Sequence, residues 1–349
     1  MSAASVSDPT ATYMEHLALS AQGGAPQVWP LMAGIAINAG CNSRCSYCWS
    51  WKEAMDNTPL ADLRHAVDEL AEVHIRQIHL AGGEPFLHPD LPELVGHIQA
   101  KGLFSAICTN GTFLSSERYR AVADAGLQSL TLSLDTMDPQ TYQYLRGIPL
   151  APIWKSFTRL LEMRDRYPTL GLGIGMVLSR ANIDHVIPAV EFAHTMDFSI
   201  GIQPLHAIYY GGGEAEHLMC READLPRLHA LIARLIEMKR GGYPIANPVP
   251  YLEGCPDYLV YRRLPKQFRC TAGFSSIIIN PQLDVRVCAY MEPVGNLRRD
   301  KMLDLWMSDD ARRKRGDMLN LRCTKCWQRC ETEVVSEECI DSLVRTSSP

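Results

Sequence analysis

The stretch Gly40-Cys41-Asn42-Ser43-Arg44-Cys45-Ser46-Tyr47-Cys48 decides how the rest of this chain is interpreted. Three thiolates on so short a loop can hold three irons of a cuboidal iron-sulfur cluster and leave the fourth iron without a protein ligand. Such an iron can bind a small molecule. The loop therefore predicts an enzyme before it predicts an electron carrier or a structural metal site.

Zinc and disulfides are the alternatives for these thiols. Structural zinc prefers four closed ligands, often as two separated pairs, and a lone cysteine triple with no histidine at hand suits it poorly. The N-terminus lacks a basic region followed by an apolar stretch, so it does not read as a secretory signal. We therefore expect a cytoplasmic protein, in which cysteines are metal ligands more often than disulfide partners.

Composition sets further limits. The chain has 349 residues, of which 46% are apolar and 21% charged, enough for one large α/β domain and a smaller one in a soluble, globular protein. A net charge of -5 argues against a nucleic-acid-binding surface. No segment approaches the roughly 20 apolar residues that span a bilayer, so no membrane contact is expected.

Buried strands alternate with helices after a lead-in, residues 1–30, that we expect to be flexible. The first strand, residues 31–38, leads directly into the cysteine loop. Further strands are predicted to end at 79–80 and to span 104–109, 129–135, 171–178 and 200–204, and helices near 59–73, 90–101, 115–125, 138–146, 151–166 and 185–196. Six such units predict a parallel sheet with crossover helices, either open or closed into an incomplete barrel.

Polar or glycine-rich segments follow the predicted strands. Gly82-Gly83-Glu84-Pro85 follows the second strand, Thr109-Asn110-Gly111 the third, and the fourth contains Ser133 and Asp135. Paired glycines let a backbone approach a ligand closely, and Glu84 offers an acceptor for an ammonium group. Each segment alone is commonly a plain turn. Together with the cysteine loop at one edge of a sheet, they predict a binding site.

The C-terminal part is rich in cysteine. A long helix is predicted near 222–239, and a turn at 241–244 suggests a boundary, giving a barrel over 31–215, a helical linker over 216–250 and a cysteine-rich domain over 251–349. Cys323-Thr324-Lys325-Cys326 has the spacing of a metal knuckle, for which a zinc ribbon is the alternative. Cys108 and Cys220 are most simply buried small apolar residues.

The spacing Cys41-x3-Cys45-x2-Cys48, with Tyr47 and the Gly82-Gly83-Glu84-Pro85 turn, resembles the radical S-adenosylmethionine (SAM) superfamily over about residues 31–205. The resemblance implies a partial (β/α)6 barrel of parallel strands. It implies that the three cysteines bind a 4Fe-4S cluster whose open iron chelates SAM. It further implies contacts from seven residues to SAM: Tyr47, Gly82, Gly83, Glu84, Thr109, Asn110 and Ser133. Asp135 and Arg146 fit a pattern frequent in the family.

The C-terminal region is similar to the SPASM domain or the shorter twitch extension, which bind auxiliary iron-sulfur clusters. The resemblance rests on Cys270, Cys288, the pair Cys323 and Cys326, and the Gly295-Asn296-Leu297 and Leu305-Trp306 segments. It departs from the full pattern, because Leu283 stands where a glycine is usual and only three residues separate Cys326 from Cys330. One auxiliary cluster fits the first four cysteines, and Cys255, Cys330 and Cys339 could replace members or bind a second cluster.

The family's reaction starts when an electron, delivered by a donor such as a flavodoxin or ferredoxin, cleaves SAM to a 5′-deoxyadenosyl radical that abstracts hydrogen from the substrate. Oxidation, epimerisation, decarboxylation or cross-linking can follow. Our leading expectation is a small polar natural product, a sugar, aminocyclitol or nucleoside as in antibiotic biosynthesis, because neither end has room for an added peptide-recognition domain.

Two alternatives remain. One is a maturase of a ribosomal peptide or protein residue, with recognition supplied by another chain. The other, of a different class, is a non-catalytic iron-sulfur or zinc protein. Residues after the sixth strand, His206, Tyr209, Tyr210, Glu214 and His217, could face the substrate cavity or lie on an ordinary surface loop.

Overall fold

The computed structural model describes residues 20, 29–52, 56–113, 115–206, 215–266, 268, 270–323 and 326–327. Strands and helices alternate over the first two thirds of this range, close to the predicted positions. The strands are β1 (Met32–Ala36), β2 (Gln77–Ala81), β3 (Phe104–Thr109), β4 (Ser129–Ser133), β5 (Gly171–Leu178), β6 (Ser199–Pro204), β7 (Ser276–Ile279), β8 (Asp284–Arg286) and β9 (Gly295–Asn296).

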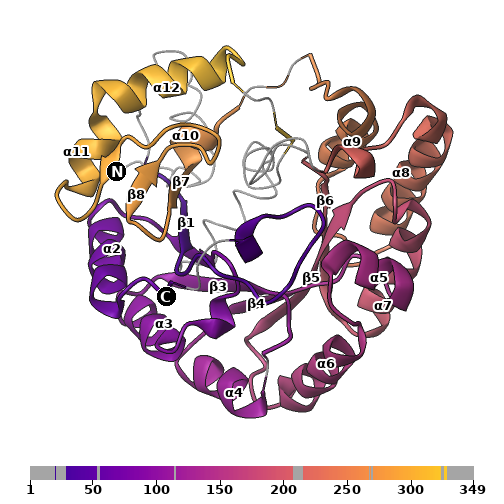
Figure 1. Cartoon of the computed structure of the whole chain (residues 1–349), viewed down its shortest axis with the longest axis horizontal. Helices are drawn as coiled ribbons and strands as arrows, with labels where there is room; N and C mark the ends of the chain where they lie inside the picture. Colours follow the sequence, from indigo (N-terminus) through magenta and orange to yellow (C-terminus); the bar gives the residue numbers. More distant parts are fainter. Residues whose placement is uncertain are drawn as a thin grey trace, which may run out of the picture.

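The strands of the described residues form one sheet in the order β6-β5-β4-β3-β2-β1-β7-β8-β9. Neighbours from β6 to β7 are parallel, and β8 and β9 add an antiparallel hairpin. The sheet curves, and helices lie around its outer side (Figure 1). The prediction of a partial (β/α)6 barrel followed by a small cysteine-rich domain is confirmed.

The helices cover one face of every barrel strand. They are α2 (Leu60–Glu72), α3 (Leu91–Ala100), α4 (Ser116–Asp124), α5 (Pro139–Arg146), α6 (Ala151–Arg164), α7 (Val186–Thr195), α8 (Leu225–Arg240), α9 (Val249–Tyr261), α10 (Ala272–Ser275), α11 (Met302–Met307) and α12 (Asp309–Leu319). In β1 the side chains of Ala33 and Ile35 are fully buried in the core shared with these helices, while the alternate residues are half-buried. Strand β1, and β4 with the same alternation, therefore have a packed outer face and a less buried inner face.

The chain crosses the sheet after β6. Helices α8 and α9 lie on the β6 side of the sheet, whereas α10, α11 and α12 lie on the opposite side, beyond β1 (Figure 1). Strand β7 lies between Cys270 and Cys288 in the sequence, and it pairs in parallel with β1, from Met32 against Ser276 to Ile35 against Ile279. Sequence periodicity predicts a strand and not its partner, so this pairing was not anticipated.

The free edge of β6 is covered by the segment expected to be a boundary. Ile200 donates its N–H to the carbonyl of Pro244 (2.8 Å) and accepts from Ala246 (2.9 Å). Asn247 completes the edge, since its side chain accepts from the N–H of Ile202 (2.7 Å) and donates to the same residue's carbonyl (2.9 Å). An amide side chain that replaces a strand satisfies backbone groups and blocks further pairing.

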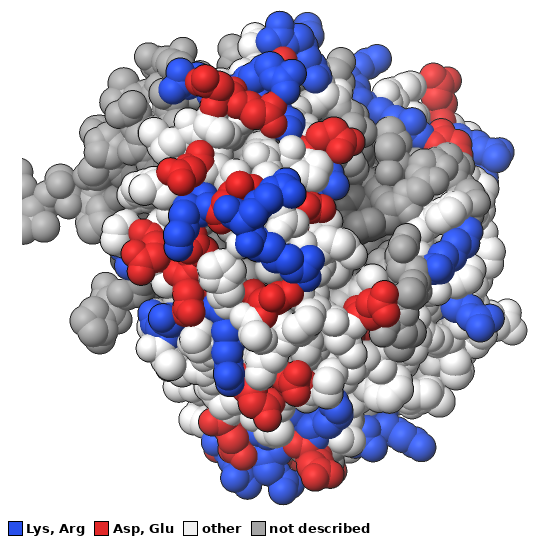
Figure 2. Space-filling view, turned by 60° about the vertical axis from the view of Figure 1, so that its left-hand side comes forward, with Lys and Arg blue, Asp and Glu red and all other residues white. Residues whose placement is uncertain are grey.

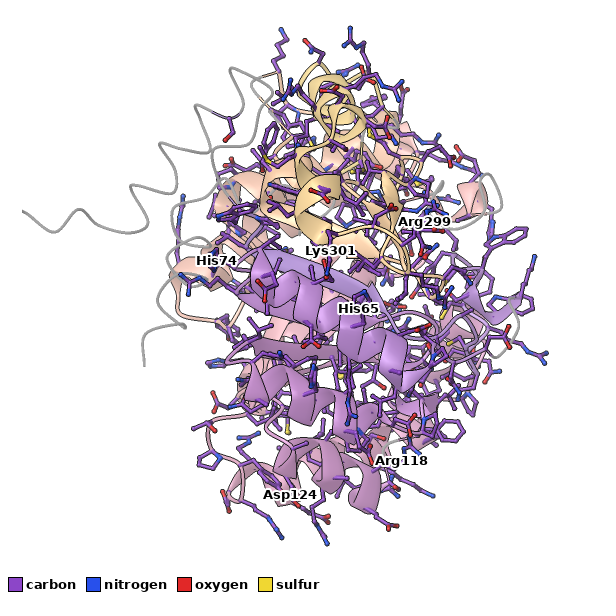
Figure 3. All side chains as sticks on the ribbon, turned by 90° about the vertical axis from the view of Figure 1, so that its left-hand side faces the viewer. His65, His74, Arg118, Asp124, Arg299 and Lys301 are labelled. Atoms are coloured by element: carbon purple, nitrogen blue, oxygen red, sulfur yellow. The ribbon has the colours of Figure 1, made fainter. Side chains whose placement is uncertain are left out.

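Polar contacts fasten α2 to the C-terminal domain. Glu69 accepts from Lys301 Nζ (2.8 Å) and from the backbone N–H of Met302 (2.8 Å). His65 contacts the carbonyl of Leu297 (2.9 Å), and its label lies beside that of Lys301 where the two parts meet (Figure 3). The carboxylate of Glu69 thus accepts a backbone donor at the start of α11, where negative charge is favoured.

Acidic and basic side chains are interspersed over the face shown in Figure 2. No single-sign field dominates this face, as the small net charge predicts. In the described part of the chain, no helix combines the length and the apolar composition that crossing a membrane would need.

Candidate active site

The cysteine loop begins where β1 ends and is held by the Gly82-Gly83-Glu84 turn after β2. Gly83 and Glu84 donate their N–H groups to the carbonyls of Asn38 and Gly40 (3.1 Å each). A Cβ on Gly83 would lie 1.7 Å from the carbonyl oxygen of Gly40, and Gly82 has a φ of +123°. Both positions therefore require glycine. The close backbone approach expected of these glycines is an approach to the cysteine loop itself.

Glu84 joins this turn to the end of β3. Its side chain is almost fully buried and accepts from Thr109 Oγ1 (2.6 Å), the N–H of Asn110 (2.7 Å) and the N–H of Phe86 (3.1 Å). Burial raises its pKa, although these hydrogen bonds act to lower it. The carboxylate predicted to accept an ammonium group thus has three protein donors and holds two strand ends together.

Asn110 links the end of β3 to the first cysteine. Its Nδ2 lies 3.6 Å from Cys41 Sγ and donates to Asn42 Oδ1 (2.9 Å). Asn42 in turn donates to Thr112 Oγ1 (2.6 Å). Hydrogen bonds to cluster sulfurs help to set the potential of an iron-sulfur centre. Sequence reasoning placed Thr109 and Asn110 at this edge and missed Asn42 and Thr112, which only their side-chain partners identify.

Behind Cys45 lies a buried polar group contributed by α5 and the end of β4. Arg146 Nη1 lies 3.5 Å from Cys45 Sγ, and its Nε lies 3.2 Å from Asp135 Oδ2. The hydroxyl of Tyr47 donates to Asp135 Oδ2 (2.5 Å) and accepts from Arg146 (2.9 Å). The side chain of Tyr47 is therefore fixed within the protein, which leaves its backbone for the expected approach to adenine.

Small residues line the inner face of β4 and β5. Ser129, Thr131 and Ser133 stand opposite Gly171, Gly173 and Gly175 in the register. The interior of a closed (β/α)8 barrel is instead filled by branched side chains. The glycines of β5 lie directly against neighbouring hydroxyl side chains, since a Cβ on Gly173 would lie 2.8 Å from Ser199 Oγ. The alternation of glycine in residues 171–175 was the sequence signal for this feature.

Cys108 also lies on the inner face. Its thiol is exposed and lies 3.6 Å from Ser133 Oγ, one of the predicted cofactor contacts. The expectation that Cys108 is a buried apolar residue is therefore wrong, because its neighbours Ile107 and Thr109 take the buried positions of β3. Cys220 is buried as expected.

The C-terminal cysteines lie in a separate apolar setting. Cys270 and Cys288 are buried in a small cluster with Val287, Ala311 and Met318. Cys323 and Cys326 are partly exposed, and Cys330 and Cys339 lie outside the described residues. Cys255 is fully buried in α9, where its thiol donates to the carbonyl of Tyr251 (3.4 Å).

The turn between β7 and β8 has Leu283 at the position where the SPASM pattern usually has glycine. The φ of this leucine is +66°, a left-handed conformation that favours glycine. The leucine side chain is fully buried. Burial of this side chain offsets the backbone strain of the turn.

Trp327 fastens the cysteine knuckle to α9. Its indole N–H donates to the carbonyl of Tyr251 (3.0 Å), and the hydroxyl of Tyr251 donates back to the carbonyl of Trp327 (3.0 Å). Their rings stack with centroids 5.5 Å apart. Gly254 makes room, since a Cβ there would lie 2.5 Å from the indole. We call Trp327, Tyr251 and Gly254 the tryptophan latch. No motif in the sequence predicts this contact.

His206 lies at the end of β6 between the barrel and this latch. Its Nδ1 lies 3.1 Å from the hydroxyl of Tyr258 and 3.3 Å from that of Tyr290. Burial lowers the pKa of His206 to about 4, although the backbone of Trp327 acts to raise it. His217 is exposed, and Tyr209, Tyr210 and Glu214 lie outside the described residues. Among the described residues that were predicted to face the substrate cavity or a surface loop, His206 is buried against protein side chains.

The donor set of the cysteine loop suits a sulfur-bound cluster. Within the described ranges, no three His, Cys, Asp or Glu side chains converge closely enough for one metal ion. Thiolates that bind different irons of a cluster need not converge. Burial raises the pKa of Cys41 to about 11, so the metal-free thiol is protonated at neutral pH and iron binding would release its proton.

Comparisons with known proteins agree with these features. The family described as the radical SAM superfamily matches residues 35–193, and the SPASM iron-sulfur cluster-binding domain matches residues 270–330. The PqqA peptide cyclase of Xanthomonas campestris pv. campestris (strain B100) is 28% identical over 288 residues, which are 80% of this chain and 73% of the relative. The similarity to this relative thus extends over most of both chains.

Two solved structures share the fold. Streptococcus suis SuiB bound to precursor peptide SuiA aligns over 88% of this chain and 72% of its own, at a TM-score of 0.67 and 18% identity. Native anSMEcpe with bound AdoMet and Cp18Cys peptide aligns over 91% of this chain and 99% of its own, at a TM-score of 0.62 and 17% identity.

These findings overturn the preference for a small polar molecule over a peptide as substrate and partner. The curated relatives are named for a peptide substrate, and both solved structures hold a peptide. The preference rested on the lack of an added recognition domain. However, anSMEcpe holds a peptide in its structure and aligns with this chain over 99% of its own length.

Proposed function

Because the chain is a radical SAM enzyme with a C-terminal SPASM domain, we propose that it modifies an amino-acid residue within a peptide or protein. The observation that carries this proposal is the similarity to a PqqA peptide cyclase, which extends over 80% of the chain. The inner face of β4 supports the proposal, because Thr131 and Ser133 present hydroxyl groups there on half-buried side chains.

The enzyme uses a 4Fe-4S cluster, SAM and an auxiliary iron-sulfur centre. When bound, these groups supply hydrogen abstraction from carbon by the 5′-deoxyadenosyl fragment of SAM. We assign the first cluster to Cys41, Cys45 and Cys48. We assign SAM to the surrounding strand ends, where the contributing residues are Tyr47, Gly82, Gly83, Glu84, Thr109, Asn110 and Ser133.

Glu84 and Asn110 act chiefly by placing other groups. Glu84 fixes the end of β3 beside the cysteine loop through the donors described above. Asn110 offers its side-chain N–H toward Cys41 Sγ. Substitution of Glu84 would therefore move the strand end as well as change a charge.

We assign an auxiliary cluster to Cys270, Cys288, Cys323 and Cys326. Cys255, Cys330 and Cys339 are candidates for a further ligand or a second cluster. Because the first two cysteines are buried under α12 and the knuckle is fastened to α9, this centre would be shielded from water. Such a position suits a centre that passes an electron between the substrate and an external donor.

The experiment uses anaerobically reconstituted enzyme with SAM, a reductant and the peptide encoded nearest to its gene. We expect 5′-deoxyadenosine together with a mass change on the peptide, and neither product from a Cys41→Ala variant. The matched control is Cys220→Ala, which removes a buried thiol assigned no ligand role. A mass change on sugars or nucleosides, with none on peptides, would overturn the proposal.

A further inference from the structure

Asp135 and Arg146 form a buried ion pair directly behind the cysteine loop. Asp135 is fully buried and Arg146 is 8% exposed, with 3.2 Å between Nε and Oδ2. Removing two charges from water costs free energy that their attraction does not always recover. Stability alone therefore gives a weak reason for this pair, and its position beside Cys45 suggests another.

The loop does not need these side chains to dock on α5. The backbone carbonyls of Leu145 and Arg146 accept the N–H groups of Ser46 (2.9 Å) and Arg44 (3.1 Å). Gly147 makes the approach possible, because a Cβ there would lie 2.5 Å from the carbonyl of Arg44. Main-chain contacts thus hold the loop, and the side-chain pair is available for a different effect.

That effect is electrostatic. Arg146 presents an N–H to Cys45 Sγ at 3.5 Å and carries a positive charge. A reduced cluster bears one more negative charge than an oxidised one, so a neighbouring cation that hydrogen-bonds a ligand sulfur favours reduction. Asp135 opposes this effect, because its carboxylate lies against the same guanidinium and is held by the N–H of Val177 (2.8 Å).

We propose that Asp135 and Arg146 set the reduction potential of the cluster held by the cysteine loop, with Arg146 raising it and Asp135 lowering it. Both are positioning residues in this role, since neither needs to touch substrate. The inference rests on the proposed cluster assignment and not on the proposed peptide substrate.

The test is a redox titration of the reconstituted holoenzyme without peptide, followed by electron paramagnetic resonance. The cluster with the open iron is recognised by the change of its signal on adding SAM. In Arg146→Gln we expect the ratio of reduced to oxidised cluster, measured at a fixed solution potential, to fall about tenfold. This corresponds to a decrease of about 59 mV in the reduction potential for one electron. In Asp135→Asn the ratio should rise.

The opposite signs make the test decisive. If the two residues have only a structural role, both variants should lose the cluster, or their reduction potentials should shift in the same direction. Either result would overturn the proposal. Reduction potentials that stay unchanged in both variants would overturn it as well. If Arg146→Gln does not fold, Arg146→Lys replaces it, and the loss of the fork-shaped contact should still lower the ratio. The matched control is Arg234→Gln, which removes an arginine of the same charge from α8, where it forms a 2.6 Å ion pair with Glu237, and should leave the potential unchanged.

Failure of the two proposals can be told apart. A holoenzyme whose cluster signal responds to SAM but which modifies no peptide refutes the substrate and leaves the redox pair standing. A wild-type enzyme without any SAM-sensitive signal removes the cluster assignment, and the redox pair with it.

Discussion

The two cysteine regions of this molecule are supported by opposite kinds of contact. The loop from Cys41 to Cys48 is surrounded by polar groups, with N–H donors directed at the sulfurs of Cys41 and Cys45. Cys270 and Cys288 instead lie among apolar side chains, and the knuckle at Cys323 and Cys326 is held by an aromatic latch. The first region is arranged to influence charge, and the second to exclude water and keep its position.

The difference follows from what each centre must do. A cluster that binds SAM has to accept an electron and expose one iron, so polar neighbours that adjust its potential are useful. A centre that only relays electrons can be enclosed. Changes to one region should leave the other intact, and the largest effect is expected from the loss of a cysteine.

Removing one ligand from each region should separate the two functions. Cys45→Ala should reduce 5′-deoxyadenosine formation to the background without enzyme, because the site for SAM is lost. Cys270→Ala should retain 5′-deoxyadenosine formation while product on the peptide falls at least tenfold. Iron content and chromatography of both products provide the measurement. Equal loss of 5′-deoxyadenosine in the two variants would show that the regions act as one centre.

Much of the first region was predictable from the sequence. The cysteine spacing, the Gly82-Gly83 turn and the strand ends at Thr109 and Ser133 are local signals, and parallel strands bring their carboxyl ends together. The partners of those residues were not predictable. Arg146 reaches Cys45 across 101 positions of sequence, and only packing brings them together.

The second region was less predictable, for a physical reason. Its cysteines gave a motif, but Trp327 and Tyr251 meet across 76 positions, and neither belongs to a motif that the sequence reveals. The prediction of a small polar substrate is wrong because it depends on a feature that the sequence lacks, and a missing feature does not identify a substrate. The left-handed turn at Leu283 shows the same limit, since the leucine masks a position where glycine would have signalled the turn.

The tryptophan latch offers the next largest effect. Trp327→Ala should cost about 3–5 kcal/mol in the free energy of unfolding, because it removes a large buried side chain. Trp327→Phe keeps an aromatic ring and loses one hydrogen bond, so it should cost about 1 kcal/mol. Denaturant titration measures both. The auxiliary iron should fall in Trp327→Ala while the SAM-sensitive signal persists, and loss of that signal would contradict independent support of the two regions.

Gly147 tests the docking of the cysteine loop on α5. Gly147 and Gly102 have φ values of +66° and +69°, so alanine meets similar backbone strain at both, about 1 kcal/mol. A Cβ at Gly102 meets no atom within 4 Å, whereas one at Gly147 collides with Arg44. Gly147→Ala should therefore cost about 1–3 kcal/mol more than Gly102→Ala. It should also lower SAM cleavage, which Gly102→Ala should not. Equal costs would mean that the loop adjusts freely and that its docking on α5 does not fix the cluster site.

The smallest effect concerns His206, which follows β6 and contacts the hydroxyl groups of Tyr258 in α9 and of Tyr290. Burial lowers its pKa to about 4 from an ordinary value of 6.5, so the folded protein keeps the ring neutral while the unfolded chain protonates it below pH 6.5. Stability from this residue is complete above pH 6.5 and is lost as the pH falls toward 4. Between pH 7.5 and 5.5 the free energy of unfolding should fall by about 1 kcal/mol through this group. Urea titrations at the two pH values should show a smaller decrease in His206→Phe, whereas His217→Phe, at an exposed position, should match the wild type. If the free energy of unfolding of His206→Phe falls by as much as that of the wild type between the two pH values, burial does not hold His206 neutral in the folded protein.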